Sequence, residues 1–227
     1  MTKRTYAVAI DGPAGAGKST LARRAARDLG FYSVDTGAIY RTVGYHMDFY
    51  GIGPRDTDGI NRLLGDVNIA IRYDDEGVQH MILNGRDVTG DIRTPEMSAI
   101  ASVISAQPAV REYLLEMQRE LARAHSVVMD GRDIGTVVLP DADVKIFLTA
   151  DPEVRARRRY EELLARGEKV AFENVLADLQ QRDRQDSERK LAPLKRARDA
   201  VLLDTTEMDL EQAAAALETI VKERLGL

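Results

Sequence analysis

The chain has 227 residues, of which 44% are hydrophobic and 30% charged, a balance typical of a folded globular protein and not of a disordered or fibrous chain. It contains no cysteine and three scattered histidines, which excludes disulfides, thiolate metal sites and a cysteine nucleophile and argues against a polyhistidine metal site. Because the net charge is −5 and no apolar run suits a signal peptide or a membrane span, we expect a cytoplasmic monomer of one domain, residues 1–227, that binds neither nucleic acid nor a membrane.

The first elements predicted are a strand at 5–10, a glycine-rich loop and a helix at 18–29 that ends at Gly30. The loop matches the phosphate-binding pattern G-x-x-x-x-G-K-S and lies where that pattern works, directly between a strand and a helix. Its backbone N–H groups and the positive end of the helix dipole suit the phosphates of a nucleotide. The residues predicted to bind ATP here are Gly12, Pro13, Ala14, Gly15, Ala16, Gly17, Lys18, Ser19 and Thr20.

Two side chains of this loop have predicted chemical roles. Lys18 would act as a catalytic residue by adding a positive charge between the β and γ phosphates, and the Ser19 hydroxyl would be a ligand of Mg²⁺. The alternative, a chance glycine-rich turn, explains this context poorly, and the spacing does not fit the dinucleotide fingerprint G-x-G-x-x-G.

The loop alone does not decide among GTPases, motors, regulators and small-molecule kinases. The chain has no N-K-x-D motif for reading guanine and is short for a motor, which favours a small-molecule kinase. Such an enzyme must neutralise a triphosphate, hold a second phosphate in line and exclude water.

The remaining elements follow a regular alternation. Short strands, apolar on both faces, are predicted at 31–34, 126–129, 144–148 and 200–203. Helices are predicted at 38–49, 96–106, 109–124, 152–165, 172–182 and 210–224. This order predicts an α/β fold with a parallel five-stranded sheet covered by helices on both faces.

The segment at 67–88 departs from that alternation. Residues 67–73 and 78–83 alternate between apolar and polar side chains, the turn sequence DDEG lies between them, and Asn84-Gly85 precedes a third short strand. A small antiparallel β insert is therefore predicted. It is either a decorative hairpin or an insertion that closes over a substrate.

Two loops predicted at the carboxyl edge of the sheet carry charged and hydroxyl side chains. Residues 35–41 (DTGAIYR) follow the second strand, with Thr36 placed as a helix cap and Arg41 inside the helix, and residues 130–133 (DGRD) follow the third strand. Helix capping with a surface ion pair would explain either loop alone. Because both loops are predicted at the same edge of the sheet as the phosphate-binding loop, a ligand site is the favoured interpretation.

Basic residues are concentrated between 151 and 200. The two clusters are Arg155, Arg157, Arg158 and Arg159, followed by Arg182, Arg184 and Arg189. They form either a solvated helix face or a clamp for a polyanion.

Together these segments resemble the bacterial-type cytidylate kinases of the nucleoside monophosphate kinase family. The matching segments are IDGPAGAGKST at 10–20, DTGAIYR at 35–41, GDIRTPE at 90–96, AVRE at 109–112, DGRDIGTVVLPDADVKIFL at 130–148 and RDRQDSER at 182–189. They span nearly the whole chain in the family's order, and DTGAIYR and DGRDIGTVV are specific to it.

The resemblance implies ATP-dependent phosphorylation of CMP and dCMP with Mg²⁺ as cofactor. It implies a P-loop NTPase fold with a core of 1–62, 91–153 and 171–227, a monophosphate-binding insert at about 63–90 and a helical lid at about 154–170. Another small-molecule P-loop kinase, or a non-enzymatic regulator that binds ATP, remains the alternative.

Site residues follow from the same resemblance. The acceptor CMP would be bound by Thr36, Arg41, Ser102, Arg111, Arg132, Asp133, Asp186 and Arg189. Arg158, Arg182 and Arg184 would reach the phosphates of ATP, and Arg132 and Arg158 would join Lys18 as catalytic residues. Ser102 and Asp186 would read the cytosine edge or, for Asp186, the sugar.

Overall fold

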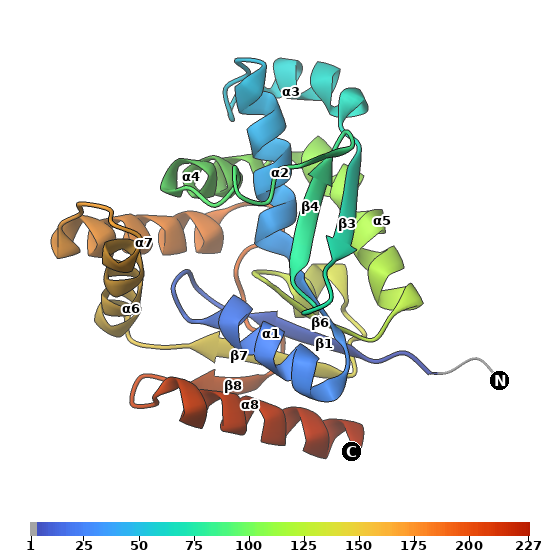
Figure 1. Ribbon diagram of the computed structural model, residues 1–227, viewed down its shortest axis with the longest axis vertical. Coiled ribbons are helices and arrows are strands. Elements are labelled where there is room, and N and C mark those ends of the chain that lie inside the picture. The colour runs from blue at the N-terminus through green and yellow to red at the C-terminus, as the bar shows by residue number, and fades with distance from the viewer. Residues whose placement is uncertain (1–3) are drawn as a thin grey trace.

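A computed structural model describes residues 4–227 and contains a five-stranded sheet at its centre (Figure 1). All strands of this sheet run parallel, in the order β2-β6-β1-β7-β8. The bounds are β1 Ala7–Asp11, β2 Tyr32–Asp35, β6 Val127–Gly131, β7 Val144–Thr149 and β8 Val201–Asp204. The predicted α/β class and all five predicted strands are confirmed.

Helices cover both faces of the sheet, as the apolar strands require. The bounds are α1 Lys18–Leu29, α2 Thr36–Phe49, α3 Thr57–Leu63, α4 Pro95–Ile104, α5 Pro108–Ala124, α6 Pro152–Ala165, α7 Phe172–Glu188 and α8 Leu210–Leu225. No helix within residues 4–227 combines the length and the apolar character needed to cross a membrane.

The central strand β1 shows how one strand serves two cores. Val8 and Ile10 are fully buried in a cluster with α1 and α8, whereas Ala9 is buried in a second cluster with α2 and α5. Successive side chains of a strand point to opposite faces, so each face receives every second residue. The carboxyl ends of β1, β2 and β6 are thereby held side by side.

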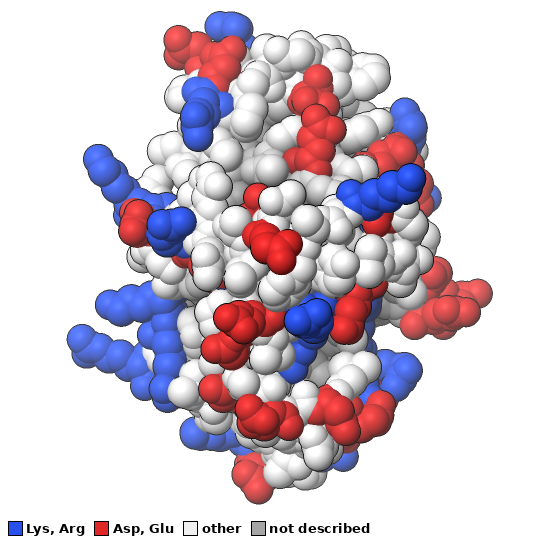
Figure 2. All heavy atoms as spheres, turned by 90° about the vertical axis from the view of Figure 1, so that its left-hand side faces the viewer, with Lys and Arg blue, Asp and Glu red and all other residues white. Residues whose placement is uncertain are grey.

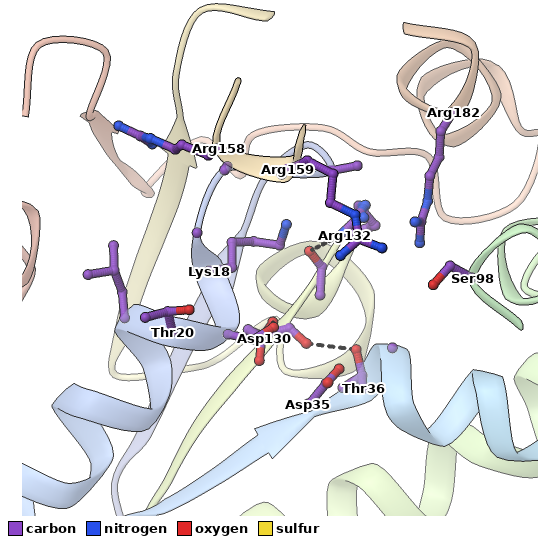
Figure 3. Close-up of a pocket in the computed structure, with 18 of the residues that line it drawn as sticks. Lys18, Thr20, Asp35, Thr36, Ser98, Asp130, Arg132, Arg158, Arg159 and Arg182 are labelled. Carbon is purple, nitrogen blue, oxygen red and sulfur yellow. Dashed lines mark hydrogen bonds between the residues drawn. The ribbon is translucent and has the colours of Figure 1, made fainter. Parts of the chain in front are cut away.

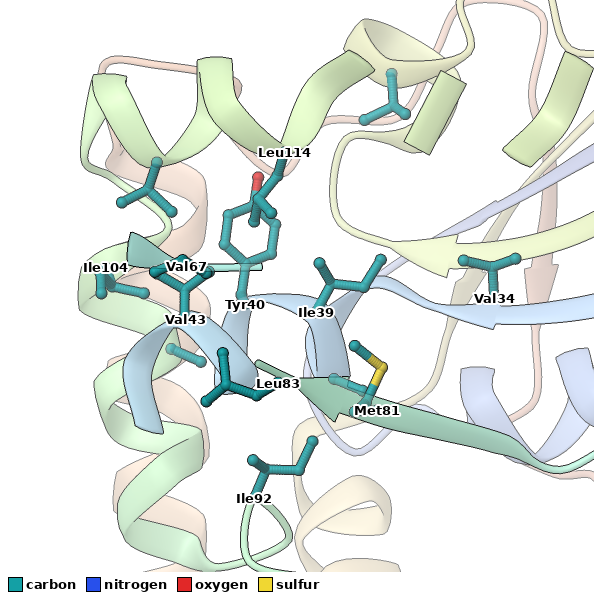
Figure 4. Packing of buried hydrophobic residues seen from close by; sticks show 14 of the residues in the cluster. Val34, Ile39, Tyr40, Val43, Val67, Met81, Leu83, Ile92, Ile104 and Leu114 are labelled. Carbon is teal, nitrogen blue, oxygen red and sulfur yellow. The ribbon is translucent and has the colours of Figure 1, made fainter. Parts of the chain in front are cut away.

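The predicted antiparallel insert is present as β3 Ile69–Tyr73, β4 Gln79–Leu83 and β5 Arg86–Asp87. Met81 and Leu83 of β4 pack into the same buried cluster as Ile39 and Val43 of α2 (Figure 4). The insert is therefore part of the main core.

Hydrogen bonds also join this insert to β2. The Gln79 side-chain oxygen accepts from the backbone N–H of Asp35 at 2.7 Å, and the Tyr73 hydroxyl donates to the carbonyl of Ser33 at 2.9 Å. The insert thus contacts the strand end where one of the predicted ligand loops begins.

Helices α2 and α3 differ from what the sequence predicts. Helix α3 was not predicted, because its seven residues include a glycine and too few apolar positions to show a helical period. Helix α2 starts two residues earlier than predicted, and its cap is Asp35, whose carboxylate accepts from the N–H of Ala38 at 2.9 Å. The assignment of Thr36 as the cap was wrong, because Thr36 is already the first helical residue.

Helices α6 and α7 pair beside the glycine-rich loop. Their shared buried cluster consists of Ala14, Ala156, Leu163, Val175 and Leu179. The range predicted for the lid, 154–170, contains most of α6 and the following loop, whereas α7 begins at Phe172 and continues six residues beyond its predicted end at Arg182. The role of this helical pair as a lid stays a prediction.

Candidate active site

The glycine-rich loop connects β1 to α1 in a conformation that requires glycine. At Gly12 φ is 154°, and an added Cβ would lie 1.9 Å from the carbonyl oxygen of Leu148 in β7. At Gly17, the residue before α1, φ is 87°. These positions let the backbone curl over the first turn of α1, where free N–H groups and the helix dipole favour an anion.

Lys18 lies in this loop with almost no exposed surface. Its ammonium donates to the carbonyl of Pro13 at 2.7 Å. Burial, together with the nearby guanidinium of Arg132, lowers the pKa of Lys18 well below its usual range. Additional negative charge beside Lys18 would stabilise its ammonium form, which is what a bound phosphate provides.

A cleft of about 730 Å³ opens in front of Lys18. It is bordered by the glycine-rich loop, the start of α2, helix α4, the loop after β6, helices α6 and α7, and the loop before α8. Figure 3 shows Lys18, Arg132, Arg159 and Arg182 arranged around this space. The two predicted ligand loops both border it, so they converge as expected.

Two arginines of the cleft have an Nε–H group that makes no hydrogen bond within residues 4–227. Among the described residues, the Nε atoms of Arg41 and Arg182 are buried without a hydrogen-bond partner. Burial, and after it the charge of Arg132, lowers the pKa of Arg182 to about 10. An N–H group that is buried and unpaired costs free energy, so these groups are suited to receive an anionic ligand.

Acidic side chains hold two of the cleft arginines in place. Asp35 pairs with Arg41 at 2.9 Å, and Asp186 of α7 accepts from Nε of Arg132 at 2.7 Å. Burial alone would raise the pKa of Asp186, but Arg132 and Arg182 hold it below its usual value. Both carboxylates are therefore charged and keep the guanidinium groups oriented near the cleft.

Ser19 and Asp130 place two side-chain oxygen groups next to each other near the glycine-rich loop. The Ser19 hydroxyl donates to Oδ2 of Asp130 at 2.8 Å, and Oδ1 of Asp130 is buried without a partner among the described residues. Burial, and then the charge of Asp35, raises the pKa of Asp130 to about 7. A cation here would restore the charged carboxylate.

These oxygens fit Mg²⁺, which is usually held by one or two protein oxygens together with substrate phosphates and water. Within residues 4–227 no group of three or more His, Cys, Asp or Glu side chains is arranged to hold a metal by itself. Ser19 and Asp130 would thus hold Mg²⁺ only together with further ligands from outside this pair.

Thr36 and Ser102 border the cleft from two sides. The Thr36 hydroxyl donates to the carbonyl of Asp130 at 2.7 Å and so joins the loops that follow β2 and β6. The Ser102 hydroxyl lies 3.5 Å from Oδ1 of Asp186. Three of the predicted acceptor-site residues, Thr36, Ser102 and Asp186, therefore face one space.

Arg111, Asp133 and Arg189 form a buried charged group. Asp133 pairs with Arg111 through one oxygen and with Arg189 through the other, the latter at 2.9 Å. Arg111 also donates to the carbonyl of Ser105 at 3.1 Å. Asp133 and Arg189 line the cleft, whereas Arg111 lies behind them.

The two basic clusters separate into different environments. Arg158 lines the cleft but donates to the carbonyl of Thr205 at 2.7 Å, and Arg157 lies over the ring of Phe172 at 4.6 Å. Arg184 is exposed and is not among the residues that line the cleft. Residues two positions apart on a helix face different sides, so Arg184 cannot share the direction of Arg182.

Four further arginines border the cleft, although the sequence provided no assigned role for them: Arg23, Arg93, Arg159 and Arg166. Arg159 belongs to the first basic cluster, which was the available signal. On the face shown in Figure 2, Lys and Arg are most numerous along the left-hand side, with others elsewhere among scattered Asp and Glu. Within the two basic clusters Arg157 and Arg184 are exposed and Arg155 is buried, so the solvated-face interpretation holds for part of them only.

Comparisons with known proteins identify the family of this chain. The family model for cytidylate kinase matches residues 8–223. The cytidylate kinase of Carboxydothermus hydrogenoformans is 50% identical over 94% of this chain and 96% of its own length, and that of Geobacter sulfurreducens is 48% identical over 98% and 95%. A crystal structure from Eubacterium ventriosum covers 97% of this chain and 99% of its own with a TM-score of 0.55 at 13% identity, which shows a shared fold. The chain therefore belongs to the cytidylate kinase family.

Proposed function

We propose that the protein transfers the terminal phosphoryl group of ATP to CMP and dCMP, yielding ADP and the corresponding diphosphate. The observation that carries this proposal is the surplus of buried cationic groups around one cleft. Lys18, Arg41 and Arg182 all line this cleft, and Nε of each of the two arginines has no hydrogen-bond partner among the described residues. Two phosphate-bearing ligands that meet there would satisfy these groups.

The donor ATP would lie with its phosphates on the glycine-rich loop and the first turn of α1. Lys18 would stabilise the charge that develops on the transferred group. Mg²⁺ would be held by Ser19, with Asp130 as the carboxylate behind it, and would supply positive charge between the phosphates. Arg158, Arg159 and Arg182 are the remaining cations on this side.

The acceptor phosphate would be bound by Arg41 and Arg132, whose orientations are set by Asp35 and Asp186. An oxygen of that phosphate attacks the γ phosphorus, the bond to the bridging oxygen of ATP breaks, and its electron pair leaves with ADP. Because the transfer needs little covalent help, the arginines act mainly by holding the two phosphates in line.

The base and sugar would contact the other acceptor-side residues. Ser102 and Asp186 lie together, and Asp133 holds Arg111 and Arg189 behind them. Cytosine presents an amine donor and a ring acceptor, whereas uracil presents the reverse pattern. A site that accepts from the amine would leave uracil with facing acceptors, which costs about 1–3 kcal/mol.

A turnover assay with a panel of acceptors tests this proposal. ADP formation would be measured with ATP, Mg²⁺ and CMP, dCMP, UMP, AMP, GMP or shikimate, and with no acceptor as the blank. We expect the highest kcat/KM for CMP and dCMP. Preference for another acceptor would indicate a different small-molecule kinase, and ATP binding without turnover of any acceptor would indicate a regulator.

A further inference from the structure

The buried Arg155 connects segments that lie far apart in the sequence. Only 5% of its side chain is exposed, although it belongs to a run of basic residues that reads as a surface cluster. Its Nε donates to the carbonyl of Ala150 at 2.9 Å, and its Nη1 donates to the carbonyl of Ala14 at 2.8 Å. Arg155 thus ties the start of α6 to the glycine-rich loop.

The carboxylate of Asp183 in α7 completes this connection. One of its oxygens accepts from Nη1 of Arg155 at 2.7 Å, and the other accepts from the backbone N–H of Ala14 at 3.1 Å. Both backbone groups of Ala14 are therefore bonded to the helical pair. We call Arg155, Asp183 and Ala14 the loop bridge.

Apolar packing reinforces the loop bridge. Ala14 and Leu179 belong to the buried cluster between α6 and α7. At Gly15, an added Cβ would lie 3.2 Å from the carbonyl oxygen of Arg155 and 3.5 Å from Leu179, so the loop lies directly against both helices. The base of the helical pair and the glycine-rich loop, which we also call the donor loop, therefore form one packed unit.

Helix α7 carries two residues of the cleft next to this attachment. Arg182 immediately precedes Asp183, and Asp186 follows one turn later, where it orients Arg132 through a hydrogen bond of 2.7 Å. Two carboxylates on one helix thus contact the donor loop and the acceptor arginine. A shift of α7 relative to the loop would change the relative placement of both phosphates.

We infer that Arg155 and Asp183 are positioning residues that set the distance between the donor loop and the acceptor side of the cleft. They touch neither reacting group, and they act through Ala14 and through the placement of α7. This inference rests on the proposed function. Because phosphoryl transfer depends on alignment, and a misplacement of about 1 Å can reduce a rate roughly 100-fold, loss of the bridge should lower kcat more than it weakens either nucleotide.

The test uses Asp183→Asn, Arg155→Met and the double variant of the full chain. Asparagine keeps an oxygen for the N–H of Ala14 but loses the charge that Arg155 contacts, and methionine keeps an apolar stem at the buried position of Arg155. The matched control is Asp199→Asn, which removes another carboxylate from an ion pair, with Lys145, that does not line the cleft. Thermal unfolding verifies that each variant is folded.

We expect kcat to fall about 10- to 100-fold in each single variant, with KM for ATP and for CMP within about threefold of the wild-type values. The double variant should lose no more than the worse single variant, because both remove one bridge. The control should retain its kcat. A kcat within twofold of wild type in both single variants, or equal rises in both KM values at constant kcat, would overturn the inference.

Hydrogen exchange provides a readout that does not depend on turnover. In Asp183→Asn the peptide covering 7–20 and the second half of α7 should exchange faster together, while α8 should not change. Unchanged exchange in the loop would refute the attachment. Failure of the wild-type protein to phosphorylate CMP would instead contradict the proposed function, so the two failures are distinguishable.

Discussion

Replacement of Arg41 by methionine tests whether the cleft has separate donor and acceptor sides. In the structure Nη2 of Arg41 pairs with Asp35 at 2.9 Å and its Nε is buried without a partner. We propose that the guanidinium of Arg41, which lines the cleft, binds the phosphate of CMP. A hydrogen bond to a charged group is worth about 1.5–3 kcal/mol, and about 1.4 kcal/mol corresponds to a factor of ten. The KM for CMP should therefore rise roughly 10- to 150-fold.

The variant should stay folded, because methionine keeps the aliphatic stem of the arginine. Asp35 loses its ionic partner but retains the hydrogen bond from the N–H of Ala38, and 31% of its side chain is exposed to solvent. Burial alone would raise the pKa of Asp35, and Arg41 is the main group that lowers it. In the variant that pKa should rise, with a small effect on the free energy of unfolding.

The assay measures ADP formation while CMP is varied at saturating ATP, and then ATP at saturating CMP. We expect the KM for ATP to stay within about threefold of the wild-type value. Arg27→Met is the control, because Arg27 is an exposed arginine in the last turn of α1 that does not line the cleft. Equal losses for ATP and CMP, or an unchanged KM for CMP, would refute the division into two sides.

Three other predictions follow from the same cleft. Lys18→Ala should lower kcat by several orders of magnitude in a folded protein, since the ammonium stabilises the transferred phosphoryl group; activity within about tenfold of wild type would contradict that role. Ser102→Ala should reduce the CMP-to-UMP ratio of kcat/KM, chiefly by weakening CMP, and an unchanged ratio would place base recognition elsewhere. Asp130→Asn should gain thermal stability relative to wild type as the pH rises from 5 to 8. The folded-state pKa of Asp130, about 7, exceeds its usual value of 3.8, so its contribution to stability is complete below about pH 4 and is lost as the pH rises through 7. A difference in Tm that stays constant across this pH range would show that Asp130 does not carry the raised pKa.

Local patterns in the sequence were sufficient to predict the strands of the sheet and the glycine-rich donor loop. The strand before Gly12, the glycines and the helix after Lys18 are contiguous in the sequence. Their conformation is therefore set by steric contacts between neighbouring residues. The strands were equally readable because burial on both faces favours apolar residues at most positions. Asp35 and Thr36 show the limit of this reading, because either side chain can cap a helix and only the backbone path decides between them.

The contacts of the four neighbouring arginines on α6 could not be predicted from their order in the sequence. Successive residues on a helix point about 100° apart, so the cluster must diverge, but the partner in each direction comes from a distant segment. Arg155 meets the glycine-rich loop and Asp183, Arg157 meets Phe172, Arg158 meets Thr205, and Arg159 meets the cleft.

The sequence by itself determined the α/β class, the donor loop, the antiparallel insert and the two loops that border the cleft. Tertiary structure decided which charges are buried, which are paired and which remain free to meet a ligand. The difference has one physical cause: periodicity and turn chemistry act over a few residues, whereas desolvation and ion pairing depend on groups such as Ala14 and Asp183 that are 169 residues apart.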